Sequence, residues 1–97
     1  MTEISLKRKI EILDAEIEKL KAEIEGATSS IDEANRLIAE EAFRQQAFKE
    51  AGIHRPPSKL KEHEQTLTVM QATLEKSEHE LKALVAVRDK LYQASEP

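Results

Sequence analysis

Residues 6–38 read LKRKIEILDAEIEKLKAEIEGATSSIDEANRLI and contain the strongest pattern in the chain. Isoleucine recurs every seven residues, and a second series of leucine and alanine recurs with the same period. The first series is Ile10, Ile17, Ile24, Ile31 and Ile38, and the second is Leu6, Leu13, Leu20, Ala27 and Ala34. An apolar period of 3.5 residues makes helices wrap around a partner helix. The stretch therefore predicts a helix whose two apolar series form a seam against another helix.

Residues 26–30, GATSS, interrupt this stretch, because all of them except Ala27 form helix poorly. Ser30 and Glu33 also match a capping box, which would begin a new helix there. The heptad phase nevertheless runs unbroken through the segment, and a loop has no reason to preserve phase. We therefore predict one helix over about residues 2–51, and keep three helices in all, with a break at 26–29, as the alternative.

A clear chain break follows at residues 52–57, GIHRPP. Gly52 suits a helix C-terminus, and two consecutive prolines cannot continue a helix. A second helix is predicted over about residues 58–94, with its own heptad series of Leu60, Leu67, Leu74 and Leu81. Because the connection is short, we expect the helices to be antiparallel. A tight turn would then put residue 94 beside about residue 15 and leave the first dozen or so residues unpaired.

The predicted fold is all-α: residues 1–97 form a single domain, a long antiparallel helical hairpin or coiled coil. Since a lone hairpin shields seam residues from one side only, we predict a homo-oligomer, most simply a dimer that forms a helical bundle. In a parallel pair Lys9 would face Asp14, although the sequence leaves parallel and antiparallel packing open. The predicted oligomerisation seam comprises Leu6, Ile10, Leu13, Ile17, Leu20, Ile24, Ile31 and Ile38.

The composition excludes several classes of protein. The chain has three aromatic residues, no cysteine and a formal net charge of −4, which argues against β-sandwiches, disulfide scaffolds and thiolate zinc sites. Lys7-Arg8-Lys9 is the densest basic cluster, and three cations are too few for firm binding to a phosphate backbone. No apolar run reaches the roughly 18–20 residues of a membrane span, and the N-terminus lacks the plan of a secretory signal. We expect a cytoplasmic location with no membrane partner.

The sequence predicts no catalytic residue, cofactor or metal site, and hence no enzyme. Its histidines include His63 and His79, each between two glutamates, but adjacent helix residues point about 100° apart and cannot share a metal ion. The chain has no glycine-rich phosphate loop, and its many carboxylates lack a predicted pocket that would shift a pKa.

The predicted hairpin tip carries the candidate partner-binding residues, which are Phe43, Phe48, Ile53, His54 and Arg55. Aromatic residues and arginine are enriched at the energetic centres of interfaces, although the sequence favours the other interpretation of the two phenylalanines, in which they pack in the bundle core where isoleucine and leucine run out. We predict a non-enzymatic protein–protein interaction module, such as an adaptor, a small chaperone or an inhibitor of a larger complex. The alternatives are a structural spacer or oligomerisation element, and weak nucleic-acid binding through the basic N-terminal end.

Overall fold

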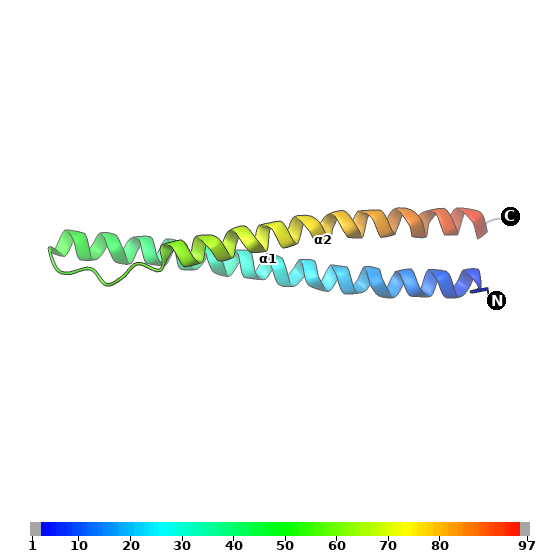
Figure 1. Ribbon diagram of the computed structural model, residues 1–97, viewed down its shortest axis with the longest axis horizontal. Helices are drawn as coiled ribbons and strands as arrows, with labels where there is room; N and C mark the ends of the chain where they lie inside the picture. Colours follow the sequence, from blue (N-terminus) through cyan, green and yellow to red (C-terminus); the bar gives the residue numbers. More distant parts are fainter. Residues whose placement is uncertain (1–2, 96–97) are drawn as a thin grey trace. The chain divides into compact units, whose positions relative to one another are not determined.

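The computed structural model describes residues 3–95, which form two α-helices joined by one loop (Figure 1). Helix α1 spans Leu6–Ala51 and helix α2 spans Leu60–Ser95. The predicted all-α helical hairpin is confirmed. Contacts divide the chain into two compact units. We call them the terminal unit, which is described for residues 3–25 and 74–95, and the loop unit, Gly26–Thr73.

Helix α1 continues without a break through residues 26–30, as the unbroken heptad phase predicted. Gly26 is exposed, and a β-carbon added there would meet no heavy atom within 4 Å. Ser30 lies half-buried within the helix rather than at its start. The alternative of three helices is therefore wrong, because the poor helix formers lie inside a helix whose seam is anchored on both sides of them.

A serine caps the start of each helix. The Arg8 backbone N–H donates to Ser5 Oγ over 3.2 Å, and the Leu60 N–H donates to Ser58 Oγ over 3.2 Å. Such bonds satisfy N–H groups that have no partner within the helix. The predicted starts near residues 2 and 58 were thus a few residues too early.

Helix α1 ends in a Schellman motif at Gly52, the predicted cap. Gly52 has a φ of 69°, in the left-handed region. Its N–H donates to the Lys49 carbonyl over 3.2 Å, and the Ile53 N–H donates to the Phe48 carbonyl over 3.3 Å. Both bonds satisfy carbonyls of the last helical turn, and the left-handed conformation that they require favours glycine.

Substitution of the two glycines of the chain by alanine should have opposite effects on the free energy of unfolding. Gly52→Ala should lower the free energy of unfolding by about 1 kcal/mol, because a β-carbon opposes the left-handed conformation. Gly26→Ala should raise it by up to about 1 kcal/mol, because alanine favours an exposed helix interior that has room for it. Urea unfolding followed by circular dichroism measures both, and changes of the same sign would contradict the assignment of these two positions.

The loop folds back along the last turns of α1 instead of turning at its tip. Gln45 Nε2 donates to the Pro56 carbonyl over 3.2 Å, and the Lys59 N–H donates to a Glu41 carboxylate oxygen over 3.4 Å. Helix α2 therefore begins opposite Glu41, not opposite Ala51 as a tight turn would require. The two prolines favour extended backbone, which carries the chain back along α1 before a helix can start.

The register of the terminal unit also differs from the prediction. Arg88 Nη1 lies 3.2 Å from Asp14 Oδ1, whereas a tight turn would have placed about residue 95 opposite Asp14. Residues at the end of α2 therefore lie opposite residues near the start of α1. The predicted overhang of a dozen unpaired residues is wrong.

The core follows the predicted seam. The buried apolar residues are Ile17, Leu20, Ala27 and Ala34, and the buried polar ones are Glu41 and Ser77. All five of these that lie on α1 occupy seam positions. The seam residues Ile10, Leu13, Ile24, Ile31 and Ile38 are half-buried, and Leu6 is exposed. A single partner helix thus covers the seam unevenly, as expected of a two-helix pair.

Candidate interaction surfaces

Glu41 lies on α1, and its hydrogen bonds hold the end of the loop against that helix. It occupies the seam position one heptad after Ala34, and only 3% of its surface is exposed. Its carboxylate accepts hydrogen bonds from the Lys59 backbone N–H over 3.4 Å, from Gln45 Nε2 over 3.1 Å and from the Arg44 guanidinium. Gln45 Nε2 also donates to the Pro56 carbonyl. One carboxylate and one amide thus hold the loop and the start of α2.

These contacts lower the pKa of Glu41 from its ordinary value of 4.5. The hydrogen bond from Gln45 is the largest cause, and the Lys59 N–H and the Arg44 charge act in the same direction, while desolvation opposes them. Each donor stabilises the ionised form of the carboxylate. Glu41 is therefore held as an anion at the beginning of α2, where the helix dipole also favours negative charge.

In the terminal unit, the polar seam residue that bonds across the helix pair is Arg88. It occupies the seam position one heptad after Leu81, and its guanidinium bonds Asp14 across the helix pair. The Arg88 Nε atom is buried and has no hydrogen-bond partner among residues 3–95, although it lies 3.8 Å from Asp89 Oδ1. A polar group in an apolar seam favours one register over its neighbours, because a shift would leave that group unpaired.

The structure divides the predicted tip residues between two surfaces. Phe43 is 75% exposed, and it projects from the side of α1 opposite the loop, because Glu41 and Gln45, two residues away in either direction, both face the loop. Phe48 is half-buried. On the loop itself, Ile53, His54 and Arg55 are all exposed. Phe43 therefore does not pack in the core of the hairpin itself.

Charged and polar side chains flank Phe43 on its face of α1. Arg36 bonds Glu33 over 2.6 Å and Glu40 over 2.8 Å, and both hydrogen bonds raise the pKa of Arg36. On the other side, Gln46 donates to Glu50 over 3.0 Å. Because three carboxylates accompany one guanidinium, the surroundings of Phe43 are net acidic.

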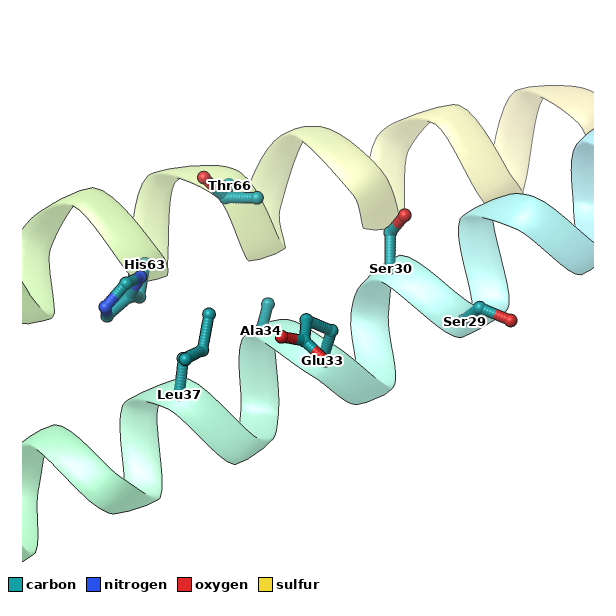
Figure 2. A pocket seen from close by; sticks show the side chains of 7 residues that line it. All are labelled: Ser29, Ser30, Glu33, Ala34, Leu37, His63 and Thr66. Carbon is teal, nitrogen blue, oxygen red and sulfur yellow. The ribbon is translucent and has the colours of Figure 1, made fainter.

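A shallow groove lies between the helices of the loop unit, with a volume of about 350 Å³. Figure 2 shows Leu37 and His63 pointing toward each other across it, with Ser30 near the other end. The groove is lined by Ser29, Ser30, Glu33, Ala34, Leu37, His63 and Thr66. Although most of these residues are polar, the surface that they turn toward the groove is mainly apolar. Across residues 3–95, no group of three or more histidine, aspartate or glutamate side chains could hold a metal ion.

Two exposed apolar residues of the terminal unit were not among the predicted site residues. Ile12 is 39% exposed and Val87 is 47% exposed, and neither belongs to the seam. The sequence feature that could have identified them is an apolar residue at a flanking position of each helix, where a charged residue is usual. Arg88 was missed too, although counting one heptad beyond Leu81 leads to it.

Neither helix of the described chain has an apolar stretch able to cross a membrane. The comparisons with known proteins add no relative: no family model matches the sequence, and no curated protein or solved structure matches it significantly.

Proposed function

We propose that this protein is a non-enzymatic protein–protein interaction module that acts as an adaptor, a small chaperone or an inhibitor of a larger complex. The observation that supports this proposal is the exposure of Phe43, an aromatic side chain left without cover in an ordered helix. Burying an aromatic ring provides a large part of the energy of many interfaces. The absence of cysteine is consistent with action in the cytoplasm.

The charges around Phe43 indicate which kind of partner surface would fit this side of α1. Glu33, Glu40 and Glu50 outnumber Arg36 on this face of α1. A complementary protein would present an apolar pocket for the ring and basic side chains at the rim of that pocket. Arg36 is paired with Glu33 and Glu40, and these three groups together keep one net negative charge, to which Glu50 adds another.

Affinity capture tests this surface through two matched variants. Phe43→Ala should lose a stoichiometric partner that wild-type protein retains from a lysate of its native source. Val69→Ala, which also removes an exposed apolar side chain of the loop unit, should retain that partner. Because both residues are exposed, circular dichroism should show unchanged helicity. Equal capture by the two variants, or a loss of helicity in Phe43→Ala, would contradict the role of Phe43.

A second function, self-association, is supported by the uneven cover of the seam. Six of the eight predicted oligomerisation residues remain half-buried or exposed within one chain, so a second copy would bury further apolar area. Light scattering should then give twice the mass of one chain. Ile17→Asp, the obvious variant for disrupting a dimer, is unsuitable because α2 of the same unit already buries Ile17.

A further inference from the structure

One side of the terminal unit combines exposed apolar residues with unpaired charges. Val87 lies near its centre, and Ile12 lies level with Lys90; both are exposed. Lys9 and Lys90 lie toward the end that contains the chain termini, and Glu23 and Glu80 lie toward the other end. We call these six residues the pairing face.

Heptad geometry places all six residues on the same side. Asp14 reaches Arg88 and therefore marks one flank of the helix pair. Lys9 and Glu23 each precede a seam isoleucine by one residue, and Glu80 and Val87 likewise precede Leu81 and Arg88. In an antiparallel pair, the positions that precede the seam lie on the same flank of both helices, opposite the one that Asp14 marks. Ile12 and Lys90 belong to the next position outward on that flank.

The Asp14–Arg88 bond also fixes the levels of these residues along the unit. With Asp14 opposite Arg88, Glu23 lies opposite about residue 79 and therefore beside Glu80. Lys9 lies opposite about residue 93, within about one helical turn of Lys90. Lys9 and Lys90 therefore make one end of the face basic, and Glu23 and Glu80 make the other acidic, with about 21 Å of helix between Lys9 and Glu23. Glu16 and Lys19 lie between the two ends on the same side of α1.

The charges of the pairing face are largely unsatisfied. Neither Lys9, Glu23 nor Lys90 takes part in an ion pair within residues 3–95. Glu80 has Lys76 at 4.0 Å, a long contact on the surface. Such charges are available to a partner, whereas Asp14 on the opposite flank already bonds Arg88.

We propose that a second copy of this chain docks on the pairing face in antiparallel orientation, with α1 against α1. This inference rests on the proposed self-association, and it places the contact on one flank of the helix pair, beside the seam, and gives its direction. A two-fold axis near Glu16 brings Lys9 of each copy to Glu23 of the other, and places Val87 of each copy close to Val87 of the other. A parallel dimer through the same face would instead set basic end against basic end and acidic end against acidic end. The antiparallel order is the one that the charges favour.

Cross-linking tests the orientation directly, because the chain has no native cysteine. Under mild oxidation Glu16→Cys should form a disulfide dimer, since residue 16 of each copy lies near the axis. Lys9→Cys alone should not, but an equimolar mixture of Lys9→Cys and Glu23→Cys proteins should form the mixed dimer. A disulfide dimer of Lys9→Cys alone, or a failure of Glu16→Cys to cross-link in a protein that sediments as a dimer, would overturn the proposal.

Charge exchange gives an independent test by sedimentation equilibrium at low salt. Lys9→Glu should weaken the dimer about tenfold, because two attractive contacts become repulsive. Glu23→Lys should do the same, and the double variant Lys9→Glu/Glu23→Lys should restore the dimer. Glu16→Gln should tighten it by removing like charges near the axis. Absence of rescue in the double variant would overturn the antiparallel order.

The outcomes separate this inference from the proposed functions. A chain that sediments as a monomer under all conditions refutes both self-association and the pairing face, and leaves the Phe43 surface of the loop unit untouched. A dimer with the wrong cross-links refutes the pairing face alone.

Discussion

Ile17→Ala should lower the free energy of unfolding by about 3 kcal/mol. Ile17 is 1% exposed and is the largest side chain in the described chain that is essentially fully buried. Truncation removes favourable apolar burial and leaves a cavity that a two-helix pair can only partly close. For a domain of this size, that loss is a large part of the total stability.

Two other isoleucines of α1 provide matched controls for this effect. Ile24→Ala should cost less than Ile17→Ala, because Ile24 is half-buried, and Ile12→Ala should cost least, because Ile12 is exposed. Urea unfolding at a protein concentration low enough to keep the chain monomeric measures all three. Equal losses at the three positions would contradict the burial order that the hairpin imposes.

Glu41→Ala should release the loop from α1 and fray the first turn of α2. The substitution removes the acceptor of the Lys59 N–H and the anion at the start of the helix. Hydrogen exchange should accelerate at Lys59 and Leu60, with little change in the terminal unit. Glu41→Gln keeps the size and one acceptor oxygen, so its effect should be smaller. Unchanged exchange at both amides in Glu41→Ala would show that the loop is held by other contacts.

The lowered pKa of Glu41 also predicts a sensitivity to acid. The unfolded chain has the ordinary carboxyl pKa of 4.5, and the folded chain has a lower one. The stabilisation by Glu41 is therefore fully present above pH 4.5 and is lost as the pH falls through the folded pKa. Between pH 7 and pH 3, the melting temperature should fall further for the wild-type protein than for Glu41→Gln. The other carboxylates are the same in both proteins and therefore lower both melting temperatures equally. An equal loss would contradict the ionised state of Glu41.

The two proposed surfaces lie in different units and would serve different partners. Pairing through the terminal unit would give an assembly with two copies of Phe43. An assembly with two equivalent sites can bind a multivalent partner more tightly than one copy can, provided that the geometry allows both sites to engage. Weaker capture of a partner by Lys9→Glu, in addition to its loss by Phe43→Ala, would link the two surfaces.

Much of the fold followed from local periodicity. The seven-residue repeat identified Ile17, Leu20, Ala27 and Ala34 as core residues and showed that Gly26 lies within a helix. These features depend on residues a few positions apart along one helix, where side-chain direction is set by the helix itself. The cap at Gly52 was predictable for the same reason, because its hydrogen bonds join neighbouring residues.

The register of the two helices was not predictable in this way. It depends on how far the loop runs back along α1, which is set by the bonds from Gln45 to Pro56 and from Glu41 to Lys59. These bonds join residues 11 and 18 positions apart, and the Arg88–Asp14 bond spans 74 positions. No short-range pattern signals such pairs.

The amino-acid sequence by itself determined that the chain forms helices, which face of each is apolar and where α1 ends, since all three are local properties of the backbone and its side chains. Only the tertiary structure decided which residues face each other and which remain uncovered. Phe43 and Phe48 are the same type of residue, yet one is exposed and the other half-buried, because the path of the loop determines which side of α1 is covered.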